Sequence, residues 1–433
     1  MKNLINISSF LPIKGRIIET DILEIDFKST FTAYFDLHEI ENYLRKKLNN
    51  AQLEISLIIS DNEDIIFDLK SDMEVTLVKR IIEDYFSFNI TKTLVNKYTN
   101  REASFINKDS GMPLIGTTAF GIIYRNTNII EIRPITGCPL NCIFCSVDEG
   151  SKSRFRIRDY FIDEKYLIEE VEKLVNYIGN YNIEIHISAQ GEPLTYPYLF
   201  ELIEDLKKIK GINFISLQTN GILLSGEKIQ KLKKAGLDRI NLSINTLDEK
   251  KAKKITACKD YDINKIKKIA KDIVSEKIDL IIAPVVVPSI NEEDMNEIIS
   301  FAKEINAGKL GLPLGIQNYL IYKFSRKVKN VDQWDWKNFR KYLEKLEKEH
   351  NIKPLYLRKK DFLIHQRKKL PQPFRKNQII SIKIKLNGRM ETERFAVLNE
   401  RIIQIINCKK PINSSVKIKI LSIKDNIITA QEI

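Results

Sequence analysis

The chain lacks long hydrophobic runs and contains few cysteines and histidines. No apolar run approaches the roughly 18 residues of a membrane-spanning helix, and the first residues, MKNLINISSFLPIKGR, lack the apolar segment of a secretory signal peptide. Only 5 cysteines and 4 histidines occur in 433 residues. Few cysteines and no export signal are typical of a reducing compartment, so we expect a cytoplasmic protein without structural disulfides.

The length and composition indicate a folded protein of several domains. Hydrophobic residues make up 43% of the chain, which excludes wholesale disorder. A chain of 433 residues exceeds one ordinary domain, so we expect two or three.

The positive charge is concentrated at the C-terminal end. Residues 351–433 contain 19 Lys and Arg against 6 Asp and Glu, whereas residues 1–350 contain 51 of each. One alternative is a solvated surface from a genome rich in lysine and isoleucine. That bias would act on the whole chain, so the local excess favours binding of a polyanion.

Sequence periodicity divides the chain into four segments. Residues 1–122 mix alternating apolar stretches with amphipathic ones and predict an α+β domain of unknown role. Residues 123–330 alternate strand and helix patterns, and residues 331–370 predict a helical, basic connector. Residues 371–433 change to a period of two with turn residues between the strands, which predicts a small OB-like β-barrel.

The second segment predicts a parallel sheet. Its expected strands are NIIEIRPI, IEIHISAQ, FISLQTNG, RINLSIN, IDLIIAPVVV and LGIQNYLIY, with amphipathic helices between them. Six such units fit either a partial barrel or an open doubly wound sheet. In both cases ligands bind at the carboxyl ends of the strands.

Three cysteines follow the first of these strands in the stretch TGCPLNCIFCS. Cys138, Cys142 and Cys145 have the spacing C-x3-C-x2-C. A zinc site fits poorly because it needs four nitrogen or sulfur ligands, and a disulfide leaves one thiol over. Three thiolates on one loop can hold three irons of a [4Fe–4S] cluster and leave the fourth iron open.

With this motif, residues 124–329 resemble the core of the radical S-adenosylmethionine (SAM) superfamily. The resemblance implies a partial (βα)6 TIM barrel, a [4Fe–4S] cluster on Cys138, Cys142 and Cys145, and SAM bound at the open iron. It also implies that Phe144, the aromatic residue before the third cysteine, packs beside the adenine. One electron from a low-potential donor such as ferredoxin or flavodoxin then releases methionine and a 5′-deoxyadenosyl radical.

Further cofactor contacts are expected at the ends of the later strands. SAQGEP after the second strand resembles the family's GGEP-type turn, with Gln190 in place of the usual first glycine and Gly191 and Glu192 positioning the methionine. The remaining candidates are Asn220, which ends the third strand, Ser243 and Asn245 for the ribose and the methionine carboxylate, and Val286 beside the adenine. Alternatively, Ser243 and Asn245 satisfy hydrogen bonds within the barrel.

Several polar residues outside these motifs remain open. Arg154, Arg156 and Arg158 share one side if their stretch is extended, either to meet an anion or as a solvated edge. His186 is expected to be a buried histidine with a hydrogen-bond partner. Cys258 and Cys408 have no second cysteine nearby, so we interpret both as structural.

The last 60 residues resemble a TRAM domain, the OB-like barrel attached to several RNA-modifying enzymes, in size, strand pattern and basicity. The three-part layout also resembles uncharacterised archaeal radical SAM proteins. Together they lead to the hypothesis of a radical SAM enzyme that modifies a nucleoside in tRNA or another structured RNA. The alternatives are a radical SAM enzyme acting on a protein or small molecule, and a non-catalytic iron–sulfur RNA-binding protein.

Overall fold

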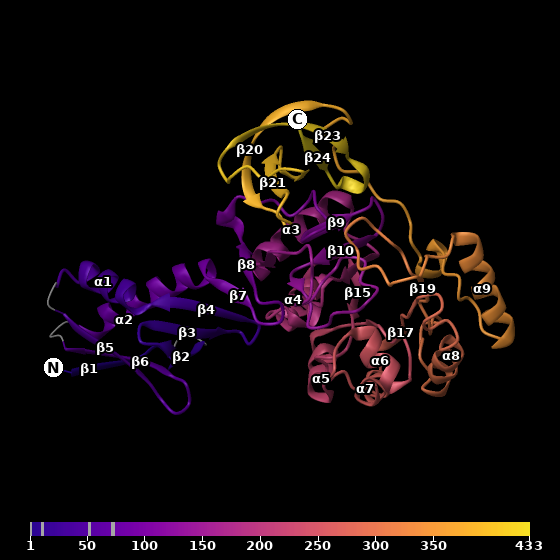
Figure 1. Cartoon of the computed structure of the whole chain (residues 1–433), viewed down its shortest axis with the longest axis horizontal. Helices are drawn as coiled ribbons and strands as arrows, with labels where there is room; N and C mark the ends of the chain where they lie inside the picture. Colours follow the sequence, from indigo (N-terminus) through magenta and orange to yellow (C-terminus); the bar gives the residue numbers. More distant parts are fainter. Residues whose placement is uncertain (1, 10–12, 51–52, 71–73) are drawn as a thin grey trace. The chain divides into compact units, whose positions relative to one another are not determined.

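The computed structural model describes residues 2–9, 13–50, 53–70 and 74–433 (Figure 1). The chain forms two compact units, Met1–Phe105 and Ile106–Ile433. The sequence placed the first boundary near residue 122. In the structure, residues 106–122 belong to the second unit, because the strand Gly121–Tyr124 pairs with the first strand of its sheet.

The first unit combines antiparallel strands with two amphipathic helices. One sheet contains β1 (Lys2–Asn6), β6 (Ile65–Lys70) and β5 (Glu54–Ile59), and another contains β2 (Ile13–Glu19), β3 (Ile22–Phe27), β4 (Phe31–Asp36), β7 (Leu94–Asn96) and β8 (Arg101–Ile106). The helices are α1 (Leu37–Lys47) and α2 (Val75–Asn89). Phe86 of α2 packs edge-on against Phe35 of β4, with ring centroids 5.0 Å apart. This aromatic packing fixes one face of α2 against the sheet.

The main sheet of the second unit is parallel apart from one edge strand. Its order is β17 (Asp279–Ile282), β16 (Arg239–Leu242), β15 (Ile212–Thr219), β13 (Ile183–Ile187), β10 (Ile129–Arg133) and β9 (Gly121–Tyr124), with β9 antiparallel to β10. β19 (Gln317–Asn318) pairs in parallel with β18 (Val285–Val286), and Ile282 bridges to Leu314, so the expected last strand joins the same barrel wall. The predicted partial barrel is therefore confirmed.

Two short strands that follow β10 and β13 form a separate two-stranded sheet beside the cysteine loop. β11 (Thr136–Gly137) pairs in parallel with β14 (Gln190–Gly191), which brings the residues before the first cysteine beside the QGEP turn. β12 (Asp159–Ile162) follows the cysteine loop. The carboxyl ends of the strands thus meet at one edge of the barrel.

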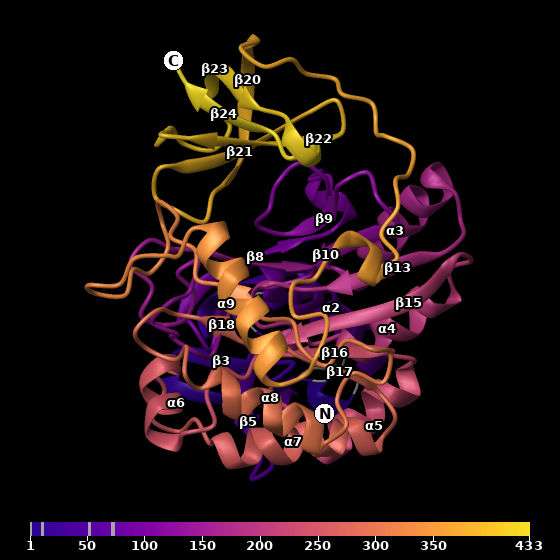
Figure 2. The same ribbon diagram turned by 90° about the vertical axis from the view of Figure 1, so that its right-hand side faces the viewer.

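Amphipathic helices cover the outer side of the sheet. They are α3 (Glu164–Ile178), α4 (Leu199–Lys208), α5 (Gly226–Ala235), α6 (Glu249–Thr256), α7 (Ile263–Ser275) and α8 (Met295–Glu304), with α9 (Trp336–Glu349) in the predicted connector. Figure 2 shows α5, α6, α7 and α8 along one side of β15, β16 and β17. Asp or Ser side chains cap several N-termini; Ser225 Oγ, for example, accepts from the Lys228 amide at 3.3 Å.

The C-terminal strands close into a small barrel, as predicted. The order around the barrel is β20 (Ile379–Asn387), β21 (Glu393–Leu398), β22 (Arg401–Ile406), β24 (Thr429–Glu432) and β23 (Ser415–Ser422), and β23 pairs back to β20. Alternate side chains such as Ile384 and Ile418 fill its core, and Cys408 lies there fully buried.

The barrel joins the core through backbone hydrogen bonds. Ile402 N donates to Ile115 O at 2.8 Å, and Ile428 N donates to Gly116 O at 2.8 Å. A Cβ on Gly116 would lie 2.1 Å from Ile402 O, so the two backbones approach as closely as glycine allows. The barrel and the core therefore form one packed body.

Among the helices that the structure describes, none combines the length and apolarity needed to cross a bilayer.

Candidate active site

The three predicted cluster cysteines line one cavity at the carboxyl end of the barrel. Its volume is about 410 Å³. Cys138 Sγ accepts from the Leu140 amide at 3.4 Å, and Cys145 Sγ accepts from the Glu149 amide at 3.3 Å. Burial raises the pKa of all three thiols. Thiolates are costly in this cavity unless a cation compensates them, which a bound iron–sulfur cluster does.

The cysteine loop is held by long-range hydrogen bonds to its backbone. The amides of Asn141 and Ile143 donate to carbonyls in the last turn of α6, at 3.0 and 2.9 Å. Arg326 donates from its backbone N to Cys145 O at 2.9 Å and from Nη1 to Cys142 O at 3.2 Å, and its Nε lies 2.8 Å from Asp148 Oδ1. These contacts join the loop to α6 and to Arg326.

Gly191 occupies a position that only glycine fits. Its φ of +143° lies in a region that side chains disfavour, and a Cβ would lie 1.9 Å from Gly137 O. From the sequence, Gly191 was expected to position the methionine of the cofactor. The structure shows that its nearest constraint is the protein backbone one residue before Cys138.

Glu192 ties the QGEP turn to the end of β15. Its carboxylate accepts from Thr219 Oγ1 at 2.6 Å, from the Leu194 amide at 3.0 Å and from the Asn220 amide at 2.8 Å. Burial raises its pKa to about 7, while these donors oppose that shift. Because both oxygens are bound by the protein, Glu192 acts here by holding the turn and Asn220 in place.

Four other predicted side chains line the cavity, and three of them also form hydrogen bonds within the protein. Phe144, Asn220, Ser243 and Asn245 line the same cavity as the cysteines. Asn220 Nδ2 donates to Cys138 Sγ at 3.6 Å. Ser243 Oγ accepts from Gln218 at 3.1 Å, and Asn245 Oδ1 accepts from the Val285 amide at 2.9 Å, so both also make the barrel hydrogen bonds considered as their alternative role.

Two predicted contacts lie outside the cavity lining. Val286 is fully buried in the barrel wall, and its neighbour Val285 faces the cavity instead, because successive residues of a strand point to opposite faces. Gln190 is also buried, and its side chain binds Arg389 of the C-terminal barrel at 3.0 Å. Neither side chain reaches the space where the cysteines meet.

Comparison with known proteins now identifies the family. Residues 132–302 match the Radical SAM superfamily. The chain is 42% identical over 374 residues to the uncharacterized protein MJ0103 of Methanocaldococcus jannaschii, a match that covers 82% of this chain and 86% of that protein. The chain belongs to the radical SAM superfamily.

More distant similarities cover less of this radical SAM protein. GTP 3′,8-cyclase of Clostridium botulinum is 31% identical over 183 residues, and the match spans about half of that relative (54%) and 42% of this chain. Among solved structures, TYW1 with a lysine-pyruvate adduct aligns with 51% of this chain and 73% of that one, at 19% identity and a TM-score of 0.35. SuiB of Streptococcus suis aligns with 78% and 69%, at 15% identity and a TM-score of 0.41. At such scores these structures add nothing to the sheet order described above.

The cofactors of this superfamily are a [4Fe–4S] cluster and SAM, and the residues present fit both. Three thiols enter the cavity from one loop, and in such a cluster each thiolate binds its own iron. Among the described residues, no three Cys, His, Asp or Glu side chains converge as the ligands of one metal ion would. When bound, the cluster supplies the electron that cleaves SAM reductively. The chain itself positions the thiolates, donates to Cys138 through Asn220 and shapes the turn at Gly191.

Sequence reasoning missed several residues of the site. Arg326, which clamps the cysteine loop, lies far downstream in a stretch without a motif. Tyr261, Gln317, Asn318 and Tyr322 also line the cavity. Gln317 and Asn318 form the last core strand. Their place at the carboxyl end of a predicted strand could have marked them as residues of the site.

The remaining polar candidates serve local structure. Arg154 to Arg158 form an irregular segment in which Arg154 is exposed, while Arg156 Nε donates to Val147 O at 2.8 Å. His186 is half-buried, and its Nδ1 lies 2.9 Å from Ser216 Oγ, so the expected hydrogen-bond partner is confirmed but full burial is not. Desolvation lowers the pKa of His186. Cys258 follows α6 and does not line the cavity.

Proposed function

We propose that this radical SAM enzyme modifies a nucleoside in tRNA or another structured RNA, and that the C-terminal barrel binds the RNA backbone. The observation that carries the proposal is a row of lysines on the outer face of the barrel. Lys383 and Lys385 belong to β20, and Lys417 and Lys419 belong to β23, the strand paired with it. Electron supply by ferredoxin or flavodoxin is part of the same proposal.

Strand alternation places these lysines together. Their neighbours Ile382, Ile384, Ile418 and Ile420 fill the barrel core, so the lysines between them point outward. Lys383, Lys385 and Lys417 are exposed and Lys419 is half-buried. The four ammonium groups therefore share one face of two adjacent strands.

The lysines of this face are available to an anionic ligand. Two other barrel lysines are already paired: Lys409 Nζ lies 2.7 Å from Glu391, and Lys410 Nζ lies 3.0 Å from Glu432. Over the part of the chain that the structure describes, no carboxylate pairs with the four lysines of the face. Phosphates can bind them without displacing an internal partner, and such contacts release counterions from the nucleic acid.

A free nucleotide is the second candidate substrate. GTP 3′,8-cyclase of Clostridium botulinum, by its name, acts on a nucleotide, and about half of that protein matches this chain. A small nucleotide would occupy the cavity beside the cysteines and would not need the lysine face. The two candidates therefore differ in what a change to that face does.

The experiment compares two full-length variants with equal charge changes. In the first, Lys383, Lys385, Lys417 and Lys419 are changed to Glu. In the second, the exposed lysines 210, 234, 250 and 268 of the core are changed to Glu. The RNA proposal expects tRNA affinity to fall in the first variant, with a log–log salt slope flatter by roughly 3, at about 0.7–0.9 per phosphate contact. Equal affinity and slope in both variants would remove the barrel from RNA binding.

A second measurement separates the substrates. Nucleoside mass spectra of total tRNA from a deletion strain should lack one modified nucleoside that the parent contains. The first variant should fail to restore it, whereas the second should restore it. Unchanged spectra in the deletion strain would leave the nucleotide candidate ahead.

A further inference from the structure

We propose that Arg389 of the C-terminal barrel is a positioning residue of the radical SAM site, so that the barrel completes the cofactor site in addition to any role in binding substrate. This inference does not depend on the identity of the substrate. It rests on the contacts of one buried side chain that crosses from the barrel into the core.

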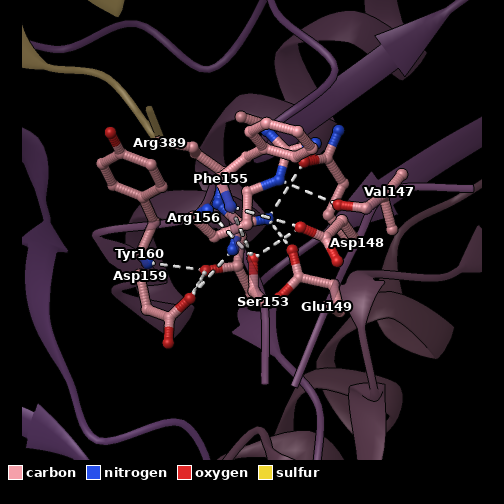
Figure 3. A network of polar contacts seen from close by, with 12 residues as sticks. Val147, Asp148, Glu149, Ser153, Phe155, Arg156, Asp159, Tyr160 and Arg389 are labelled. Atoms are coloured by element: carbon pink, nitrogen blue, oxygen red, sulfur yellow. Dashed lines mark hydrogen bonds and ion pairs between the residues drawn. The ribbon is translucent and has the colours of Figure 1, made fainter. Parts of the chain in front are cut away.

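Arg389 lies in the turn between β20 and β21 and is 1% exposed. Its Nη2 donates to Asp159 Oδ1 at 2.9 Å, its Nη1 donates to Gln190 Oε1 at 3.0 Å, and the same Nη1 forms an ion pair with Glu149. Figure 3 shows the guanidinium between these acidic side chains and the loop that carries Ser153 and Arg156. One arginine therefore binds three segments of the core.

The backbone of Arg389 is anchored as firmly as its side chain. Its carbonyl accepts from the Ile157 amide at 2.9 Å, and its own amide donates to Glu393 Oε2 at 2.7 Å. Its Nε lies 3.3 Å from the Arg158 carbonyl. The turn thus enters the core in a defined position, with the guanidinium oriented by the barrel.

The side-chain acceptors of Arg389 lie on segments that lead to the cavity of the cysteines, and one of them, Glu149, lines it. Glu149 ends the cysteine loop and lines the cavity, and its amide donates to Cys145 Sγ at 3.3 Å. Gln190 precedes Gly191, which also lines the cavity. Asp159 begins β12 and accepts from Thr136 Oγ1 at 3.0 Å, in the strand that leads to Cys138. The guanidinium therefore links both ends of the cysteine loop and the turn opposite them.

The electrostatics make this link strong. Glu149 and Asp159 are 2% and 0% exposed, so their charges need a partner inside the protein. Burial alone lowers the pKa of Arg389, but Glu149 and Asp159 outweigh it and raise the pKa above its ordinary value. The guanidinium stays charged, and its planar donors suit several acceptors at once.

Gln190 shows that the core is adapted to this arginine. The resembling turns of the superfamily carry glycine at this position, which has no side chain to accept from Arg389. Here the Gln190 side chain is buried and reaches both Arg389 and Thr118 Oγ1, the latter at 3.4 Å. Gln190, the residue that departs from the GGEP-type turn, is therefore the one that contacts the arginine of the barrel.

The test uses full-length protein reconstituted with iron and sulfide, with SAM as the probe. The variants are Arg389→Met, Arg389→Lys, Gln190→Gly and the double variant Arg389→Met/Gln190→Gly. The matched control is Arg394→Met, another barrel arginine, which donates to barrel carbonyls such as Lys410 O at 2.7 Å. Readouts are iron content, SAM affinity, the EPR spectrum of the reduced cluster with and without SAM, and thermal unfolding.

We expect Arg389→Met to weaken SAM binding by about 10-fold or more, because the cysteine loop and the turn at Gly191 lose the charge-assisted hydrogen bonds that position them. Arg389→Lys should recover part of the affinity, because one ammonium cannot meet all the acceptors. As a single substitution, Gln190→Gly should weaken SAM binding. In the double variant it should cause no further loss beyond Arg389→Met, because both substitutions remove the same contact. Arg394→Met should behave as wild type in SAM affinity and EPR.

Two results would overturn the proposal. One is a folded Arg389→Met protein with wild-type iron content, SAM affinity within twofold and an unchanged EPR response to SAM. The other applies if Arg389→Met does not fold: wild-type SAM affinity and EPR in both Arg389→Lys and Gln190→Gly would then assign Arg389 to stability alone.

Discussion

Asn220 Nδ2 donates a hydrogen bond to Cys138 Sγ across 3.6 Å. The amide is held in this orientation because its Oδ1 accepts from the Ile222 amide at 3.0 Å. A donor directed at a cluster sulfur stabilises negative charge there, so it favours the reduced state and raises the reduction potential.

Replacing Asn220 by Ala should therefore lower the reduction potential of the cluster. The expected shift is roughly 20–40 mV to more negative values, because part of one hydrogen bond to a charged group is lost in a one-electron couple. Potentiometric EPR titration measures this shift. Asn245→Ala is the control, since Asn245 lines the same cavity but binds a backbone amide. Equal potentials for wild type and Asn220→Ala would contradict the role of this amide.

The cluster assignment predicts opposite results for two cysteines. Cys142→Ala should bind far less than the about four irons and four sulfides of one cluster and should yield no 5′-deoxyadenosine. Cys258→Ala should keep both, because Cys258 lies outside the cavity lining. Iron and sulfide analysis and chromatography of the products check this. A complete cluster in Cys142→Ala would show that the loop has been misassigned.

Replacing Gly191 by Ala should disturb the cluster as well as SAM binding. The new Cβ would meet Gly137 O at 1.9 Å, and relief of that clash moves the backbone beside Cys138. We expect iron content after reconstitution to fall below half of wild type. Gly226→Ala is the control, because nothing lies within 4 Å of a Cβ there and the first turn of α5 tolerates alanine. Wild-type iron content in Gly191→Ala would be incompatible with this packing.

Glu164 predicts a dependence of stability on pH. Burial, together with the carboxyl of Asp205, raises the pKa of Glu164 to about 7 from an ordinary value near 4.5. An acid with a raised pKa contributes stability that is fully present below about pH 4.5 and lost as the pH rises through about 7. Glu164→Gln should remove this loss and be more stable than wild type at pH 8 by about 1–2 kcal/mol.

Urea denaturation at pH 5 and pH 8 tests this prediction. The gain in midpoint for Glu164→Gln should be larger at pH 8 than at pH 5. Glu201→Gln changes an exposed carboxylate in the first turn of α4 and should show no such difference. The same gain at both pH values would argue against a buried, titrating Glu164.

The sequence predicted the elements that local patterns encode. Stretches with a period of two predicted the strands of the C-terminal barrel, and alternating strand and helix patterns predicted the core. The three closely spaced cysteines predicted the cluster loop. The prediction that Val286 lies beside the adenine was wrong, because the side chains of a strand alternate between two faces and the sequence alone did not show which residue faces the cavity. An error of one residue along a strand therefore exchanges a side chain that faces the cavity for one that faces away from it.

Arg326 and Arg389 were out of reach for a different reason. Each contacts the cysteine loop across a sequence separation of more than 170 residues, with partners at Cys142, Asp148 and Glu149. No local period or motif marks an arginine whose acceptors lie in another segment. The basic C-terminal segment was therefore interpreted as an appended RNA-binding barrel, although one of its positive charges, Arg389, forms ion pairs inside the core.

The entry of Arg389 into the core sets an order for the maturation of this enzyme. Arg389 is translated 240 residues after Glu149, so the cysteine loop is complete in sequence long before the arginine that joins its ends has been made. Until the barrel folds, Glu149 and Asp159 lack this cation, and the loop that they border lacks its final support. Delivery of iron and sulfide to Cys138, Cys142 and Cys145 should therefore be most productive once the barrel has been made and Arg389 has entered the core.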